Sequence, residues 1–175
     1  IEDILKAQSQ WPLVRSIRHK PGGAASSQEA LAGKTSLMSD ERWLQGFDLL
    51  SKYDLHFDLQ TPWWHLNEAH RLARDFPETL IILNHTGLPA DRSQEGLTGW
   101  FKAMEEVAKQ HNVVVKISGL GQKNQPWSVE NNRKIVQETL AIFGIERCMF
   151  ASNFPVDSLC VSQDTLWKGF KNIVA

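Results

Sequence analysis

The sequence predicts an α/β protein with a mainly parallel sheet, and three observations carry this prediction. Short apolar runs typical of buried strands alternate with longer amphipathic segments typical of helices. Two of these runs, Leu80 to Leu83 and Cys148 to Ala151, end abruptly in polar residues, as strands do at the ligand-binding rim of such folds. The chain has 175 residues, of which 42% are hydrophobic and 22% charged. We therefore expect residues 1–175 to form a single domain with one core.

Strands and helices are expected to alternate along the whole chain. The strand candidates cover residues 13–19, 55–60, 80–84, 113–118 and 148–152. Apolar residues recur at helical spacing between them, over residues 40–52, 66–76, 99–111 and 129–143. Ser128 suits the N-cap of the last helix, and Gly144 suits its C-terminal end. This order implies right-handed crossovers between parallel strands.

Two segments lie outside this alternation. The stretch from Pro21 to Leu37 is rich in Gly, Ala and Ser, and we expect a long irregular, mobile loop there. The chain starts at Ile1 rather than at a methionine, and residues 1–10 resemble the tail of a helix already under way. The expectation from this pattern is that a beginning is missing.

Composition excludes several classes of protein. The formal net charge is -1 and the pI is about 6.7, so there is no electrostatic footprint for nucleic acid. The longest apolar runs are far shorter than the roughly 20 residues that a membrane span needs. Cys148 and Cys160 lie in and after an apolar strand, which is typical of a reduced cytoplasmic protein rather than a disulfide scaffold. We expect a cytoplasmic protein that acts on a small molecule.

The polar residues within the strands favour part of a barrel over an open sheet. Alternate residues of a strand face opposite sides, so Phe57 and Leu59 can pack under helices while His56, Asp58 and Gln60 face the other way. The same pattern recurs at Lys116 and Ser118. A doubly wound sheet covers both faces with helices and would bury these groups without partners, whereas a barrel interior or cleft suits them. A flavodoxin-like domain would also need a phosphate-binding loop, and none is convincing.

Residues at strand ends are the candidates for chemistry. Arg18 can hold a carboxylate with two hydrogen bonds, and His85 can ligate a metal or transfer a proton. Trp64, on a probable loop, is a candidate for lining a pocket, although aromatic residues are more often part of the core. A structural alternative stays open for the strand residues, in which Asp58 simply pairs with Lys116 or Arg18.

Five short motifs, in order along nearly the whole chain, carry a family resemblance. They are Val14-Arg-Ser-Ile-Arg-His-Lys20, His56-Phe-Asp-Leu-Gln60, Ile82-Leu-Asn-His-Thr-Gly87, Val115-Lys-Ile-Ser-Gly119 and Met149-Phe-Ala-Ser-Asn-Phe-Pro155. Together they resemble the amidohydrolase-2 type of metal-dependent hydrolase, which has a TIM-barrel fold. The nearest branch contains sugar lactonases and 2-pyrone-4,6-dicarboxylate lactonase. The resemblance implies that the five strands are the fourth to eighth of a (β/α)8 barrel, without the His-x-His pair of the first strand.

The resemblance also implies roles for single residues. His85 matches the active-site histidine that follows the sixth strand, and Arg18 lies where related lactonases bind substrate carboxylates. Asn153 stands where many relatives carry a catalytic aspartate, and an amide cannot act as a general base. Asp157 and Asp58 are the remaining candidates for the base. Asp157 would lie roughly 13 Å beyond Asn153 if the chain stayed extended, so it serves only if the turn folds it back.

These observations predict a hydrolase that opens a small cyclic ester or amide, most simply a lactone, by attack of water at the carboxyl-end mouth of the barrel. Candidate catalytic residues are His85, Asn153, Asp157 and Asp58, and candidate substrate-binding residues are Arg18, Gln60, Lys116 and Trp64. His85 is the candidate ligand for a divalent metal such as zinc, and metal-independent catalysis is equally open. The alternative is a non-catalytic fragment or binding domain. Such a piece would need a complementing N-terminal segment or a second copy of the chain to cover its edges.

Overall fold

The computed structural model describes residues 1–175 and contains one five-stranded sheet in the order β1-β2-β3-β4-β5. All four neighbouring pairs are parallel. The strands are β1 (Ser16–His19), β2 (His56–Leu59), β3 (Ile81–Leu83), β4 (Val113–Ile117) and β5 (Cys148–Phe150). Every predicted strand is present, although each is shorter than its apolar run. The α/β class with a parallel sheet is therefore confirmed.

Seven α-helices accompany the sheet. They are α1 (Glu2–Ser9), α2 (Ser27–Leu31), α3 (Glu41–Lys52), α4 (Leu66–Asp75), α5 (Gln94–Ala108), α6 (Val129–Phe143) and α7 (Gln163–Val174). The caps predicted for α6 are confirmed, because Ser128 accepts the Asn131 N–H and Gly144 has a φ of 75°. The prediction for α5 began five residues too late, because Ser93 caps the helix by accepting the Gly96 N–H. Helices α2 and α7 were not predicted.

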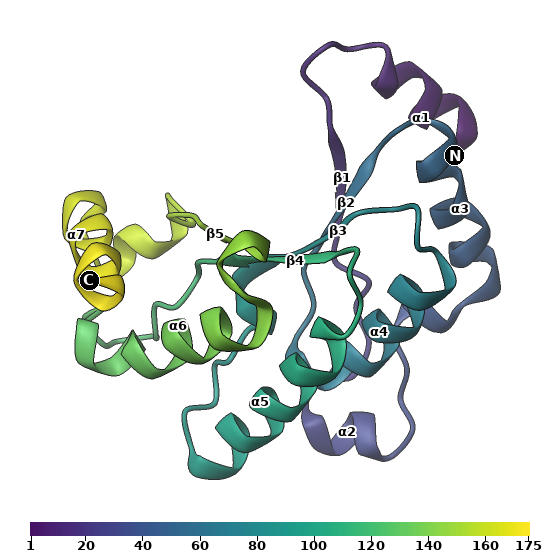
Figure 1. The fold of residues 1–175 in the computed structure, drawn as a ribbon. Helices are drawn as coiled ribbons and strands as arrows, with labels where there is room; N and C mark the ends of the chain where they lie inside the picture. Colours follow the sequence, from purple (N-terminus) through teal and green to yellow (C-terminus); the bar gives the residue numbers. More distant parts are fainter.

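The helices form an arc along one side of the curved sheet, and the opposite face of the sheet carries no helix (Figure 1). Strand residues alternate accordingly. Val113, Val115 and Ile117 are fully buried toward the helices, within a core cluster of 29 buried residues. Val114 and Lys116 lie between them and are only partly buried, because they face the open side. The predicted alternation is therefore confirmed, and it places the polar strand residues on the open face.

The long stretch between β1 and α3 is less irregular than expected. It contains α2, and it is fastened to the start of α4 by buried hydrogen bonds. The Ala24 N–H donates to His65 Nε2 over 2.8 Å, and Trp64 Nε1 donates to the Ala24 carbonyl over 3.0 Å. Glu68 accepts hydrogen bonds from the Ser36 N–H over 3.1 Å. The prediction of a wholly irregular segment was therefore wrong, because side chains distant in sequence supply its anchors.

Strands β1 and β5 lie at the two edges of the sheet, and each pairs with a neighbour on one side alone. Large apolar side chains near these edges are exposed: Leu13 before β1 and Leu159 after β5 are each 91% exposed. No helix is both long enough and apolar enough to cross a membrane.

Candidate active site

Asp58 lies at the centre of a polar cluster on the open face of the sheet. Lys116 Nζ, from β4, donates to Asp58 Oδ1 over 2.8 Å, and Ser16 Oγ, from β1, donates to Asp58 Oδ2. Asn84 Nδ2, directly after β3, donates to Asp58 Oδ1 over 3.1 Å. Polar residues from three neighbouring segments thus converge on one carboxylate of β2. The pairing of Asp58 with Lys116 is the contact that the structural alternative anticipated.

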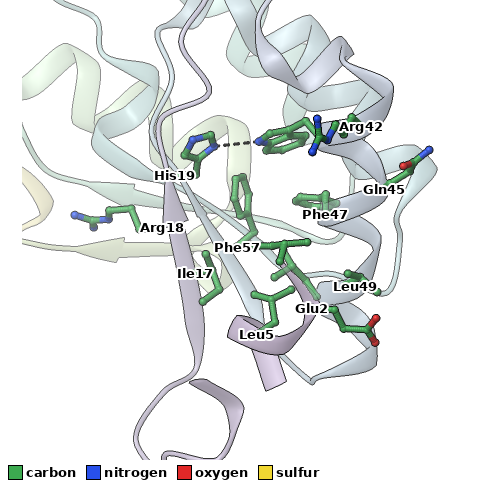
Figure 2. A pocket seen from close by; sticks show the side chains of 14 residues that line it. Glu2, Leu5, Ile17, Arg18, His19, Arg42, Gln45, Phe47, Leu49 and Phe57 are labelled. Carbon is green, nitrogen blue, oxygen red and sulfur yellow. Dashed lines mark hydrogen bonds between the residues drawn. The ribbon is translucent and has the colours of Figure 1, made fainter. Parts of the chain in front are cut away.

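Arg18 reaches the same cluster from the edge strand. Its Nη2 donates to Asn84 Oδ1 over 3.1 Å and lies 3.7 Å from Asp58 Oδ1. The Arg18 side chain is 53% exposed, so most of its hydrogen-bonding capacity faces solvent. Figure 2 shows it pointing away from β1 on the side opposite Ile17 and Phe57. Arg18 is therefore placed to bind an anion that enters the open face.

The hydrogen bonds decide the charge of Asp58. Burial acts to raise its pKa, but the hydrogen bonds from Lys116, Ser16 and Asn84 outweigh burial, so that the pKa lies below its usual value. A carboxylate that already accepts these bonds has little tendency to take up another proton. Asp58 is therefore better suited to holding the two cations, Arg18 and Lys116, than to acting as a general base.

His85 follows β3 in an unusual backbone conformation. His85 and Thr86 both have left-handed backbones, with φ of 56° and 49°, which are uncommon for non-glycine residues and strained for a β-branched one. The ring is packed against Gly119, where an added Cβ would lie 2.7 Å from His85 Nδ1. Ser118 Oγ lies 2.9 Å from the same nitrogen. The loop after β4 thus holds the imidazole in one orientation.

The surroundings of His85 keep it neutral. Burial is the main cause that lowers its pKa from 6.5 to about 4, and the positive charges of Arg18, Lys116 and Lys20 add to the effect. Its Nε2 has no hydrogen-bond partner within the protein, and it is not one of the unpaired side-chain atoms that the fold seals from solvent. His85 therefore presents one free ring nitrogen as a neutral group among cations.

Asn153 and Asp157 form a second polar group, after β5. A 3-10 helix over Val156–Leu159 turns the chain back, and Asn153 Nδ2 donates to Asp157 Oδ1 over 2.8 Å. Asp157 is 5% exposed and its Oδ2 has no partner. Burial raises the pKa of Asp157, although the hydrogen bond from Asn153 opposes the rise. The turn folds Asp157 back beside Asn153, whereas an extended chain would carry it away from that residue.

His85 and Asp157 both lie against the loop after β4. The loop after β4 supplies Ser118 to His85, and a Cβ added at Gly121 would lie 3.4 Å from Asp157 Oδ1. No hydrogen bond or ion pair joins Asp157 to the cluster around Asp58. The loop after β4 therefore contacts both His85 and Asp157.

Two predicted substrate-binding residues stand apart. Trp64 packs edge-on against Trp63, with ring centroids 5.7 Å apart, and it donates to the loop at Ala24 as described. Gln60 follows β2 and is partly buried, and its backbone N–H donates to the His19 carbonyl over 3.1 Å. Neither side chain bonds to the polar cluster, and their binding roles stay predictions.

A groove of about 690 Å³ lies beside the edge strand β1, on the helix side of the sheet. Apolar residues of α1, α3, β1 and β2 form most of its wall, among them Leu5, Ile17, Phe47 and Phe57 (Figure 2). Arg18 lines it too, but its guanidinium points to the other side of β1 (Figure 2). This groove is therefore distinct from the polar open face, and its apolar lining suits the packing of a structural element.

The residues of this chain do not fit a metal ion by themselves. No group of three or more His, Cys, Asp or Glu side chains is placed to hold one. A catalytic zinc usually takes three protein ligands, and His85 would offer one nitrogen. The charges that act on its ring are those of the cations Arg18, Lys116 and Lys20, which disfavour another cation.

Sequence reasoning missed some residues of this arrangement. Asn84 links Arg18 to Asp58, but an amide directly after a buried strand reads as an ordinary turn residue. The alternation of β4 did place Ser118 on the polar face, yet nothing local showed that it meets His85, which lies 33 residues away. The network of His65 and Glu68 gave no sequence signal beyond the two polar residues in one helical turn.

Comparison with known proteins places these findings in a family. Relatives include the uncharacterized protein y4mH of Sinorhizobium fredii, 41% identical over 173 residues, which are 99% of this chain and 58% of that protein. An L-fucono-1,5-lactonase of Burkholderia ambifaria is 28% identical over 129 residues, covering 70% of this chain and 44% of the relative. The match therefore spans 58% of the first relative and less than half of the second.

Solved structures agree on the fold. An amidohydrolase of Burkholderia multivorans with bound HEPES superposes with a TM-score of 0.81 and 22% identity, and its zinc-bound crystal form gives 0.81 and 21%. Each superposition covers 98% of this chain and 61% of the neighbour. The neighbours are TIM barrels, so the five strands form part of such a barrel, as predicted. The amidohydrolase family model matches residues 14–173, and the chain belongs to the amidohydrolase family.

Proposed function

We propose that this chain supplies the carboxyl-end mouth of an enzyme that hydrolyses a small lactone carrying carboxylate or hydroxyl groups. The observation that carries the proposal is the convergence of Arg18 and Lys116 on the open face beside the neutral His85. Cations of this kind attract and orient a carboxylate, and a neutral ring nitrogen among them can polarise a carbonyl. Two relatives named L-fucono-1,5-lactonase, 28% and 31% identical, support the substrate class.

Asp157 is the general base in this proposal. A base works best when its pKa lies near the working pH, and burial moves the pKa of Asp157 upward, whereas hydrogen bonds from Lys116, Ser16 and Asn84 move the pKa of Asp58 downward. The Oδ2 of Asp157 has no hydrogen-bond partner and is sealed from solvent in this chain, and Asn153 holds the other oxygen. In this proposal the attacking water therefore enters beside Oδ2 when the substrate is bound. Asn153, which cannot itself act as a base, thereby orients the carboxylate of Asp157.

The proposed enzyme needs more than these residues. The edge strands β1 and β5 are unpaired on their outer sides, and the apolar groove beside β1 is open. The chain covers 58% of its 41% identical relative. We infer that a segment corresponding to the unmatched part of that relative pairs with the two edges and completes the barrel.

The test is complementation. The chain is mixed with the unmatched segment of protein y4mH, and hydrolysis of L-fucono-1,5-lactone is followed with and without a chelator. Asp157→Asn should lower kcat/KM by about 100-fold or more, because a positioned base contributes that much. Asp164→Asn, which removes an exposed carboxylate of α7, is the matched control. Full activity of Asp157→Asn would remove Asp157 as the base, and a wild-type complex that turns over no lactone would refute the substrate class.

A further inference from the structure

Ser118 has a single hydrogen-bond partner, and that partner is the proposed active-site histidine. Its hydroxyl is almost completely buried, with 1% of the residue exposed, and its Oγ lies 2.9 Å from His85 Nδ1. No other hydrogen bond of the protein involves this hydroxyl. The contact joins the ends of two neighbouring strands, β3 and β4, at the carboxyl edge of the sheet.

This isolation decides the direction of the hydrogen bond. A serine hydroxyl carries one proton, whereas a neutral imidazole has one nitrogen with a proton and one without. If His85 Nδ1 donated, the buried hydroxyl proton would have no acceptor, at a cost of about 1–3 kcal/mol. If Ser118 donates, both groups are satisfied. The proton of the neutral ring then resides on Nε2.

We propose that Ser118 is a positioning residue that holds His85 in the Nε2–H tautomer, so that His85 acts as a hydrogen-bond donor and not as a metal ligand. The inference rests on the proposed function for the identity of the acceptor, which is the carbonyl oxygen of the cyclic ester as it becomes an oxyanion. A ring nitrogen that carries a proton has no lone pair for a metal ion. It can, however, stabilise negative charge that develops on a substrate oxygen.

Three further observations agree with a donor. The free Nε2 reaches solvent-accessible space rather than a sealed pocket. Arg18, Lys116 and Lys20 are the charged groups that act on the ring, and all three favour an anionic partner. Gly119, with a φ of 62°, leaves room for the ring directly beside Ser118, because a Cβ added there would lie 2.7 Å from His85 Nδ1.

The test reads the tautomer directly and needs no enzymatic activity. The 175-residue chain is labelled with 15N at histidine, and long-range 15N–1H spectra are recorded at pH 7. His85→Asn identifies the His85 signals among those of the six histidines. The expected pattern is a proton-bearing Nε2 and a bare Nδ1 whose resonance is displaced by the hydrogen bond from Ser118. A proton on Nδ1 in the wild-type chain would overturn the proposal.

Variants of Ser118 separate positioning from folding. In Ser118→Ala the Nδ1 resonance should move to that of a nitrogen without a hydrogen bond, while Ser118→Thr, which keeps the hydroxyl, should restore it. Ser152→Ala removes another rim serine, whose Oγ accepts from the Phe154 N–H, and should leave His85 unchanged. If Ser118→Ala is folded and its Nδ1 resonance is identical to that of the wild type, the role of Ser118 is refuted.

Addition of zinc provides an independent test of the His85 assignment. One equivalent of zinc added to the wild-type chain should leave the Nε2–H signal of His85 in place. Loss of that signal on metal addition would refute the assignment of His85 as a donor. Because each readout is a ring signal of His85, the tautomer can be disproved while lactone hydrolysis stands, and lactone hydrolysis can fail while the tautomer stands.

Discussion

Asn153 donates a hydrogen bond of 2.8 Å to Asp157 across the turn that follows β5. The backbone of Asn153 is left-handed, with a φ of 57°, a conformation that asparagine tolerates better than most residues. The side chain is thereby aimed back at the carboxylate four positions later. The amide at the position of the expected base therefore holds the carboxylate of Asp157, which is the base in the proposed function.

The first prediction concerns the pKa of Asp157. Asn153→Gly removes the amide and keeps the left-handed backbone, because glycine adopts positive φ without strain. The pKa of Asp157 should rise further above its ordinary value of 3.8, since the hydrogen bond that opposes burial is lost. A carboxyl 13C titration of the chain measures this value. Asn172→Gly, on exposed α7, is the control, and a pKa of Asp157 equal to that of wild type would contradict the prediction.

A second prediction concerns the buried ion pair between Lys116 and Asp58. Lys116→Met leaves a carboxylate that is 8% exposed without its main partner, and the free energy of unfolding at pH 7 should fall by about 1–3 kcal/mol. Urea unfolding measures the change. Lys168→Met breaks an exposed pair with Asp164 and should change stability by less than about 1 kcal/mol.

The sign of the pH dependence follows from the lowered pKa of Asp58. The ionised Asp58 stabilises the fold fully above its ordinary pKa of 3.8. This stabilisation is lost as the pH falls through the lower pKa of Asp58 in the folded state. The difference between Lys116→Met and wild type should therefore shrink below pH 4. A difference that stays constant down to pH 2 would show that the charge of Asp58 plays no part.

The third prediction uses the lowered pKa of His85. Between its ordinary value of 6.5 and the folded value of about 4, the unfolded chain binds a proton that the folded chain does not. Stability should therefore fall as the pH is lowered through this range, by up to about 1.4 kcal/mol per pH unit. Unfolding curves of His85→Asn should have a shallower pH slope there, whereas those of the exposed His111→Asn should keep the wild-type slope. Equal slopes for wild type and His85→Asn would disprove the depressed pKa.

The fourth prediction concerns the loop between β1 and α3. Burial acts to raise the pKa of Glu68, but hydrogen bonds from Ser39, Ser36 and His65 outweigh it, so the residue stays a carboxylate. Glu68→Gln places an amide donor among these donors and should release the loop, with a loss of about 1–3 kcal/mol. Limited proteolysis should then cut between residues 24 and 36. Glu41→Gln, exposed in the first turn of α3, should leave the cleavage pattern unchanged, and an uncut Glu68→Gln chain would show that the anchor lies elsewhere.

Much of this arrangement could be predicted because it depends on local periodicity. The alternation of Val113, Val115 and Ile117 with Lys116 and Ser118 determines which side chains face the helices, since successive residues of a strand point to opposite faces. The spacing of apolar residues likewise located α3, α4 and α6. Asp58 and Lys116 were expected on one face for the same reason, and the structure brings them into contact.

The sequence by itself thus determined the α/β class, the parallel order and the polar face. Only the tertiary structure decided which groups on that face are paired. In the folded chain Asp58 accepts hydrogen bonds from three side chains, Asp157 accepts one from Asn153, and Ser118 is hydrogen-bonded to His85. These outcomes depend on contacts between residues that are far apart in the chain and on the path of a turn, and neither leaves a periodic trace in the sequence. Partners and burial also set the pKa values, so the division of roles between the two carboxylates belongs to the fold.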